Sequence, residues 1–375
     1  MSEKKKIAII GASEFQNALI LKAKEMGYET HVFAWQAGAV GESTADHFYP
    51  ISITEKEAIL DECRRLRPEG IASIGSDLAV HTVCYVSEKL GLCSNRFEDM
   101  AACTNKYEMR RRFAAAGLYT PAFLKAEPGR TAPDASALRF PAIVKPTDRS
   151  GSRGITKVFS PAELPAAIAL AQENSFEHGA IVEEFIDGPE YSFESISFQG
   201  RHHFLAVTKK YTTGAPHFIE TGHDQPSGLS AGQVQKAIDT VFPALDALHI
   251  RNGASHAEFR INADGDICLI EIGARMGGDC IGSDLVQIST GYDFVRMVID
   301  VACGRAPVFE RVNEPMLASV RFIFRQSDLD ELRRIEREEP QSIWRVSHID
   351  AVGSHPITDS SNRYGFYITA RPLRT

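Results

Sequence analysis

Two glutamates flank a turn signal in the second half of the sequence, and their spacing could hold a divalent cation. The stretch SHAEFRINADGDICLIEIGARMGGD (255–279) has two alternating runs separated by Asp264-Gly265, which is typical of a two-residue hairpin turn. In that register Glu258 lies directly opposite Glu271, with Cβ atoms about 4.5–5.5 Å apart. Like charges in such a pair repel, whereas a hard cation such as Mg²⁺ between them converts repulsion into binding. A solvated sheet face that carries both glutamates is the alternative.

Basic and small residues follow the second glutamate. Arg275 could reach an anion held by the metal, and Gly277 and Gly278 would allow backbone N–H groups to approach a substrate carboxylate. In the same hairpin register, His256 faces Gly273. The end of this strand is therefore predicted to serve chemistry as well as structure.

A second candidate site begins at Lys145, which ends the strand-like stretch PAIVKP. The loop after it, TDRSGSRG (147–154), can fold over phosphates as a nest of backbone N–H donors. It lacks the GK[ST] ending of a Walker A motif, and a flexible surface turn is the alternative. The candidate phosphate-binding residues of the loop are Ser150, Gly151, Ser152 and Gly154.

Acidic residues interrupt the apolar pattern of IVEEFIDGPEYS (181–192). An adenine amino group and ribose hydroxyls need acceptors, which Glu183, Glu184 and Glu190 could supply. An edge strand with solvent-facing acids is the alternative for this segment alone.

The elements that must position these residues fall into two kinds. Residues 6–100 alternate strand-like stretches such as KIAIIGAS with helix-like ones such as AVHTVCYVSEKLG, which predicts a parallel sheet with helices on both faces. Its first turn, GASEFQN, lacks the glycines of a dinucleotide site, which favours a scaffold or part of a substrate wall. A helix capped by Thr104 follows, and the remainder predicts short strands, glycine turns and helices.

Composition excludes several classes of protein. The chain has 375 residues, 43% hydrophobic and 24% charged, which predicts two or three soluble globular domains. A net charge of −8 argues against a general binder of nucleic acids or anionic membranes. The seven cysteines lack a C-x-x-C pair, and no apolar segment approaches the length of a membrane span. We therefore expect reduced thiols and a cytoplasmic location, with no signal peptide at the N-terminus.

In this order and at these spacings, the motifs VKP…SGSRG, VEEFIDGPE, HAEFR and EIGAR resemble the ATP-grasp superfamily. Biotin carboxylase, the purine-pathway ligases and bacterial L-amino-acid ligases are its comparable members. The resemblance implies α/β and α+β architecture: a Rossmann-like pre-ATP-grasp domain at residues 1–103 and an ATP-grasp domain at 104–305. The latter would comprise a glycine-loop lid at about 118–185 and a central antiparallel sheet at about 186–305. A β-rich subdomain at 306–375 would complete it.

The resemblance also implies a role for each matching residue. Lys106 and Lys145 would contact ATP phosphates beneath the 150–154 loop. Glu183 or Glu184 would meet the adenine amino group, the backbone near Ile186 its ring edge, and Glu190 the ribose. Glu258 and Glu271 would bind one or two Mg²⁺ ions, which Mn²⁺ could replace, and Arg275 would stabilise the transferred phosphoryl group.

The sequence departs from the family pattern at one position. Many members have E-x-N in the second carboxylate motif, whereas here the third position is Gly273. His256 could fill the space left by the asparagine. Glu220 and His223, in IETGHDQPS, are the further candidates for substrate contacts, because amino-acid ligases have a comparable stretch near the acceptor substrate.

The function implied is a carboxylate–amine ligase that forms an amide or peptide bond through an acyl phosphate and releases ADP and phosphate. Its partners would be a small-molecule carboxylate and an amine, with no nucleic acid or membrane, and a homodimer is common in such families. A bicarbonate-activating enzyme of the biotin-carboxylase or purine-pathway type is one alternative. A nucleotide-binding regulatory protein without catalysis is the other.

Overall fold

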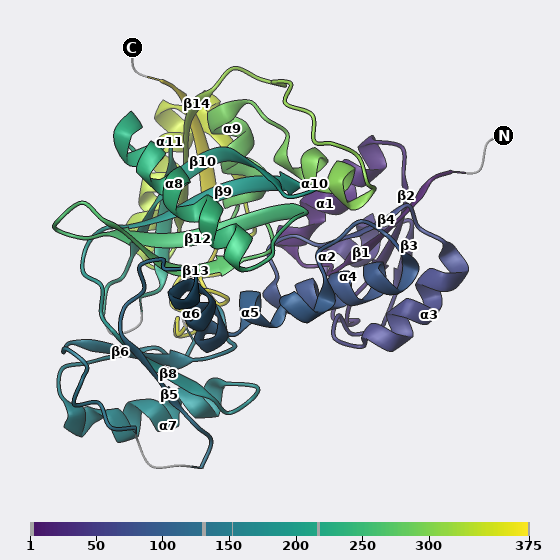
Figure 1. Ribbon diagram of the computed structural model, residues 1–375. Helices are drawn as coiled ribbons and strands as arrows, with labels where there is room; N and C mark the ends of the chain where they lie inside the picture. Colours follow the sequence, from purple (N-terminus) through teal and green to yellow (C-terminus); the bar gives the residue numbers. More distant parts are fainter. Residues whose placement is uncertain (1–3, 130–132, 152, 216–217, 374–375) are drawn as a thin grey trace.

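The computed structural model describes residues 4–129, 133–151, 153–215 and 218–373, whose strands form three sheets. Figure 1 shows them as three lobes: the N-terminal sheet at the right, the largest sheet at the upper left and a small sheet below it. The domain boundaries given above stay a prediction. No helix of the described residues is long and apolar enough to cross a membrane.

The N-terminal sheet is parallel, with strand order β3-β2-β1-β4, as the alternating pattern predicts. Successive residues of β1 (Lys6–Ile10) point to opposite faces: Ala8 and Ile10 pack beneath α3 and α4, whereas Ile7 and Ile9 pack with α1 and α10. The prediction missed β3, which has only three residues. The remaining bounds are β2 Glu29–Phe33, β3 His47–Tyr49, β4 Gly70–Ala72, α1 Glu14–Glu25, α2 Val40–Thr44, α3 Lys56–Leu66 and α4 Asp77–Leu90.

The small sheet is antiparallel, with strand order β5-β8-β6-β7, and α7 covers one of its faces. On β6 (Ala142–Pro146) the small residues Ala142 and Val144 pack against α7. Because successive side chains of a strand point to opposite faces, Ile143 and Lys145 project from the other face of the sheet. The same alternation on β8 turns Glu183 away from α7. The other bounds are β5 Phe123–Ala126, β7 Thr156–Val158, β8 Ala180–Glu184 and α7 Leu164–Asn174.

The largest sheet has eight antiparallel strands in the order β13-β12-β9-β10-β11-β14-β16-β15. Helices α8 and α10 pack against it in separate hydrophobic clusters, and α10 shares its cluster with the N-terminal sheet. Two lobes are thereby joined through one continuous core. The strand bounds are β9 Glu190–Phe198, β10 Arg201–Thr212, β11 Glu220–Gln225, β12 Gly253–Ile261, β13 Ile267–Gly273, β14 Met316–Phe322, β15 Ile343–Val346 and β16 Phe366–Pro372. The helix bounds are α5 Ala101–Thr104, α6 Lys106–Ala115, α8 Ala231–Ala247, α9 Val286–Thr290, α10 Phe294–Ala302 and α11 Gln326–Glu338.

The β12–β13 hairpin confirms the pairing of Glu258 with Glu271 but not the turn that predicted it. Asn262 N–H donates to the Asp266 carbonyl, so the loop has three residues, and the strands leave it one position out of the predicted register. A bulge at Ile270, between the pairs Glu258–Glu271 and Phe259–Leu269, restores the predicted register beyond it. The predicted two-residue turn is therefore wrong. The bulge lies between the turn and the glutamates, so it restores the predicted pairing of Glu258 with Glu271.

Helix α6 begins one residue later than the sequence predicts. Asn105, rather than Thr104, caps it, and its side chain accepts hydrogen bonds from the backbone N–H groups of Tyr107 and Glu108. The N–H of Lys106 donates to the Thr147 carbonyl, so the helix start is fixed to the end of β6. Lys106 is thereby held beside the loop that follows Lys145. All seven cysteines are free thiols, as expected.

Candidate active site

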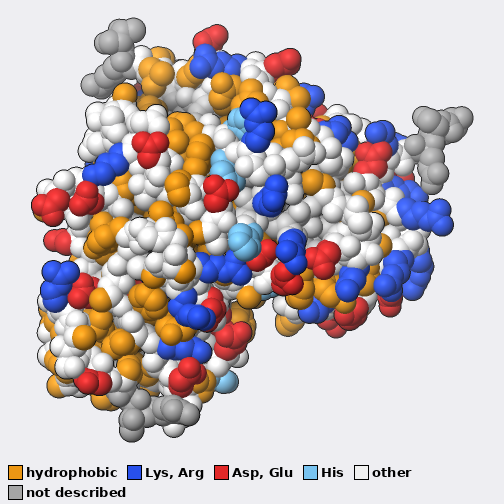
Figure 2. All heavy atoms as spheres, viewed as in Figure 1, with side chains coloured by type: hydrophobic (Ala, Val, Ile, Leu, Met, Phe, Trp, Pro, Cys, Tyr) orange, Lys and Arg blue, Asp and Glu red, His pale blue; other side chains and the backbone are white. Residues whose placement is uncertain are grey.

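A cavity of about 300 Å³ lies between the lobes and is lined by residues from all three of them. Charged side chains of both signs, with histidines, gather along the junction of the lower lobe with the rest of the molecule in Figure 2. Most of the candidate site residues line the cavity: Lys106, Lys145, Ser150, Gly151, Glu183, Glu184, Ile186, Glu190, Glu220, His223, His256, Glu258, Glu271, Arg275 and Gly278. Tertiary structure thus brings together candidates that are spread over residues 106–278 of the sequence.

Glu258 and Glu271 lie opposite each other on neighbouring strands and are mostly buried, with 23% and 21% of their side chains exposed. Each carboxylate has a lysine partner: Lys210 contacts Glu258, and Lys106 Nζ lies 2.9 Å from Glu271. Two facing carboxylates in a shielded cavity are hard oxygen donors of the kind that Mg²⁺ prefers. The donor set therefore fits a divalent cation.

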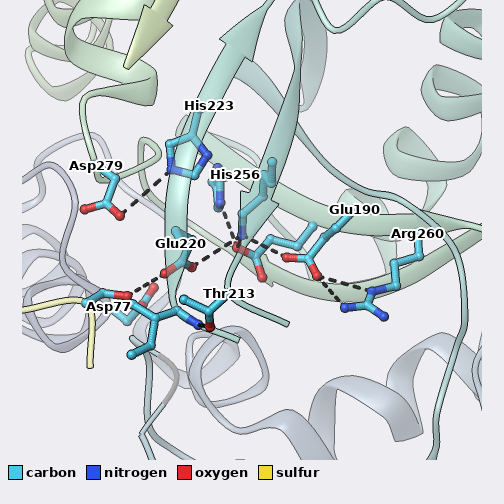
Figure 3. Close-up of polar contacts among 12 residues, drawn as sticks. Asp77, Glu190, Thr213, Glu220, His223, His256, Arg260 and Asp279 are labelled. Carbon is cyan, nitrogen blue, oxygen red and sulfur yellow. Dashed lines mark hydrogen bonds and ion pairs between the residues drawn. The ribbon is translucent and has the colours of Figure 1, made fainter. Parts of the chain in front are cut away.

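Lys210 is a central residue that the sequence analysis missed. Its ammonium group contacts three carboxylates, those of Glu258, Glu190 at 3.1 Å and Glu220 at 3.7 Å. Burial alone would lower the pKa of Lys210, but these three carboxylates outweigh burial and raise it well above its usual value. In Figure 3, Glu190 and Glu220 lie on opposite sides of the point where these contacts meet, with His256 beside it. Lys210 therefore holds the acidic wall together as a shared counter-ion.

The strand alternation explains why these charges share one face of the large sheet. Arg260 pairs in register with Glu190, and Lys210 pairs with His223, so one row of polar side chains crosses four strands. Lys210 stands beside a second lysine in TKKYT, a pattern that an exposed strand would also show. The sequence thus carries no local signal that distinguishes it.

Glu183 lies in a buried cluster with two cations. Its carboxylate receives the Arg110 guanidinium, with Nε at 2.9 Å, and also contacts Lys145. Burial opposes ionisation, but Arg110 and Lys145 hold the pKa of Glu183 below its usual value, whereas burial lowers the pKa of Lys145. Both carboxylate oxygens of Glu183 have cationic partners, and the contact of Glu183 or Glu184 with an adenine amino group stays a prediction. Arg110 also donates to the bulged Ile270 carbonyl at 2.6 Å.

The neighbouring acids frame an end of the cavity that also has apolar walls. Glu184 pairs with Arg139, whose side chain is 87% exposed. Glu190 receives the Arg260 guanidinium at 2.8 Å (Figure 3). Arg260 also donates to the Ile186 carbonyl at 2.9 Å. Apolar and aromatic side chains complete this end: Ile143, Phe185, Phe218 and Ile270.

The glycine loop contributes only part of what the sequence predicts. Ser150 and Gly151 line the cavity, and Ser152 lies outside the described residues. Gly154 does not line the cavity, because it packs against α7, where a Cβ atom would lie 2.8 Å from the Asn174 side chain. Gly154 thus serves the packing of the lobe, and its phosphate contact stays a prediction.

Arg275 is anchored by a residue from the N-terminal lobe. Its guanidinium donates to Asp77 at 2.8 and 3.1 Å in a two-point contact. Burial would raise the pKa of Asp77, but Arg275 lowers it. Asp77 begins α4, and Gly75 and Phe15 line the same cavity, so the N-terminal lobe supplies a wall, as expected.

His256 faces Gly273, as predicted, and forms a chain of contacts beneath the glutamates. Its Nδ1 contacts Glu194, and its Nε2 lies 3.4 Å from Glu258. Burial would lower the pKa of His256, but these carboxylates raise it to about 9. Glu194 also accepts the Gly277 N–H at 3.0 Å, so this group has a partner within the protein, and its approach to a substrate stays a prediction.

The candidate substrate residues Glu220 and His223 lie at the opposite wall. Ser360, in the segment before β16, donates to Glu220, and Arg363 binds Asp279 at 2.6 and 2.9 Å. His223 is only 1% exposed, and neither ring nitrogen has a hydrogen-bond partner among the described residues. Burial lowers its pKa, although Asp279 lies 3.9 Å away (Figure 3). Ser360 thus brings a polar group from the segment before β16 to this wall of the cavity.

Comparisons with known proteins agree with this geometry. Residues 138–284 match the family described as ATP-grasp domain. The crystal structure of an L-amino acid ligase from Bacillus licheniformis matches with a TM-score of 0.82 and 26% identity, covering 99% of this chain and 95% of that one. A phosphoribosylglycinamide synthetase from Anaerococcus prevotii matches with a TM-score of 0.78 and 20% identity, covering 99% and 95%. These matches confirm the predicted fold class.

Proteins related in sequence also include ligases, although they match over shorter lengths. Alanine–anticapsin ligase from Bacillus subtilis is 27% identical over 255 residues, which is 61% of this chain and 52% of that protein. The chain spans about half to three fifths of the length of the first curated relatives it matches. Residues 138–284 therefore match an ATP-grasp domain, and the fold of the whole chain is similar to that of an L-amino acid ligase.

Proposed function

We propose that the protein is an ATP- and Mg²⁺-dependent ligase that joins a carboxylate to an amine and releases ADP and phosphate. The observation that carries this proposal is the facing pair of Glu258 and Glu271 in a shielded cavity, surrounded by Lys106, Lys210 and Arg275. Phosphoryl transfer asks a protein mainly for positioning and charge neutralisation. This cavity supplies both.

The two ends of the cavity suit the two ends of ATP. The apolar wall of Ile143, Phe185 and Ile270 offers a surface for a purine, with Glu190 close by for ribose hydroxyls. Lys106 and Lys145 lie towards the loop of Ser150, and they would bind the phosphates. Glu258 and Glu271 would hold Mg²⁺, which when bound would neutralise charge on the phosphates.

In the proposed reaction, an oxygen of the substrate carboxylate attacks the γ-phosphorus of ATP, giving an acyl phosphate and ADP. The amine then attacks the acyl carbon, the carbon–oxygen bond to phosphate breaks, and the amine loses a proton as the amide forms. Arg275, held in orientation by Asp77, would stabilise the charge of the transferring phosphoryl group. No nucleophilic side chain is required.

The substrate class rests on the amino-acid ligases among the relatives, which include an L-amino acid ligase and alanine–anticapsin ligase. Glu220, which lines the cavity, suits an ammonium group, and Arg275 and Lys210 suit carboxylate or phosphate groups. Amino acids carry both kinds of charge. They are therefore the first substrates to test.

The test is a phosphate-release screen with ATP and Mg²⁺ over amino acids, singly and in pairs. We expect release to depend on a particular pair and to be lost in Glu271→Gln and Arg275→Met, with the circular dichroism spectrum unchanged. Glu331→Gln, which changes an exposed glutamate of α11 paired with Arg334, is the matched control and should keep full activity. Undiminished activity in both cavity variants would refute the proposal.

The same screen separates the alternatives. ATP hydrolysis that bicarbonate stimulates without any amino acid would indicate the carboxylase type of activity. Calorimetric ATP binding with no turnover on any substrate pool would indicate a regulatory protein.

A further inference from the structure

Two histidines and a glutamate meet on the N-terminal sheet, away from the residues that line the cavity. His31 on β2 and His47 on β3 are register partners of parallel strands, so their side chains project from the same face. Their rings stack with centroids 4.7 Å apart and an interplanar angle of 11°. Glu29 lies two residues before His31 on that face, which brings a carboxylate to the pair.

The potential ligand atoms of the three side chains converge. Glu29 Oε1 lies 2.9 Å from His31 Nε2 and 3.3 Å from His47 Nε2, and one ligand atom from each residue lies within 4.8 Å of the others. No comparable group of three histidine, cysteine or acidic side chains occurs elsewhere in the described residues. Small side-chain movements would therefore suffice to surround a single ion.

A further contact orients the buried histidine. The hydroxyl of Tyr49 lies 3.0 Å from His31 Nδ1, on the side of the ring opposite Glu29. In metal sites, a ligating histidine commonly uses its second ring nitrogen in such a hydrogen bond, which fixes the tautomer and the ring orientation. With Tyr49 engaging Nδ1, Nε2 of His31 is directed towards the shared space.

The chemistry of this donor set selects a class of metal. Two imidazoles and one carboxylate are borderline ligands that suit Zn²⁺ and its neighbours in the first transition row. His47 has 52% of its side chain exposed, so solvent could supply a fourth ligand.

We propose that Glu29, His31 and His47 form a binding site for a Zn²⁺-class metal ion, separate from the cavity that would bind ATP and Mg²⁺. The bound ion would join β3, a three-residue edge strand, to β2 by bonds much stronger than its few backbone hydrogen bonds. The consequence is a metal-dependent stability of the N-terminal lobe.

The first experiment titrates the chelator-treated full-length protein with Zn²⁺ by calorimetry and with Co²⁺ by visible absorption. We expect one equivalent to bind, with a Co²⁺ spectrum typical of four nitrogen and oxygen ligands, and an excess of Zn²⁺ to raise the melting temperature. The Glu271→Gln variant should bind the same equivalent, because the proposed site does not include the cavity glutamates. Absence of saturable binding, or its loss in Glu271→Gln, would overturn the proposal.

The second experiment uses variants of the site. His47→Gln changes a half-exposed side chain on an edge strand and should abolish both the saturable binding and the melting shift, while keeping the wild-type circular dichroism spectrum. Tyr49→Phe should weaken binding by about 10–100-fold, as loss of an orienting hydrogen bond does in other metal sites. The matched control is His348→Gln, an exposed histidine paired with Asp350, which should bind like the wild type. Unchanged Zn²⁺ affinity in His47→Gln would refute the site.

Discussion

Replacing Glu183 by glutamine tests whether the buried charge cluster behaves as the structure indicates. Glu183 is 3% exposed and lies between Arg110, which is fully buried, and Lys145, which is 4% exposed. Glutamine keeps the shape of the side chain but removes the negative charge. Two cations would then remain buried without a counter-ion, which is the costly way to disrupt such a group.

The expected loss is about 3–5 kcal/mol in the free energy of unfolding, the range for removing one partner of a buried ion pair. The adjacent residue supplies a matched control, because Glu184 pairs with Arg139, whose side chain is 87% exposed. Glu184→Gln makes the same chemical change one position along the same strand. Its expected cost is about 0–1 kcal/mol, as for surface ion pairs.

Urea denaturation followed by tryptophan fluorescence and by circular dichroism would measure both variants. Adding Lys145→Met to each background completes the experiment. In the Glu183→Gln background, this change removes an unpaired cation and should cost less than in the wild type. Equal, small losses in Glu183→Gln and Glu184→Gln, or strict additivity with Lys145→Met, would refute the electrostatic interpretation of the cluster.

Three further predictions concern the cavity walls. Lys210→Met should lower the melting temperature, because it removes the counter-ion that the three carboxylates share. Mg²⁺ should reverse part of that loss, since a cation at Glu258 restores positive charge. No effect of Mg²⁺ on the melting temperature of the variant would contradict this prediction. Burial lowers the pKa of His223, so the unfolded state binds its proton more readily and stability falls as the pH drops below about 6.5. Urea midpoints at neutral and mildly acidic pH should therefore differ less in His223→Gln than in the wild type, and an equal difference would contradict the burial effect. Gly277→Ala would place a Cβ atom 2.8 Å from buried side-chain atoms and should lower the free energy of unfolding by about 1–3 kcal/mol. Gly278→Ala should cost less, because the nearest atom to its Cβ would lie at 3.9 Å. Equal urea midpoints for the two variants would argue against this packing.

Elements with a local period could be predicted from the sequence. The alternating strands and helices of residues 6–100 predict the parallel N-terminal sheet. Of its strands only β3 is missed, because this short edge strand is partly exposed, whereas β4, equally short, is fully buried and apolar. The strand alternation that turns Lys145 towards the cavity is likewise local. The pairing of Glu258 with Glu271 was predicted through the wrong turn, and the bulge at Ile270 restored it.

Local patterns could not reveal which charges meet across the fold. Arg110 meets Glu183 from 73 residues away, and Arg275 meets Asp77 from 198 residues away. Lys210 resembles any exposed strand lysine until three carboxylates surround it.

The sequence by itself therefore determined the elements, the family motifs and the residue types available for binding ATP. Only the tertiary structure decided which carboxylates have counter-ions and which glycines serve packing. The physical reason is range: strand and helix periods arise between near neighbours along the chain, whereas burial and ion pairing depend on which distant segments come into contact.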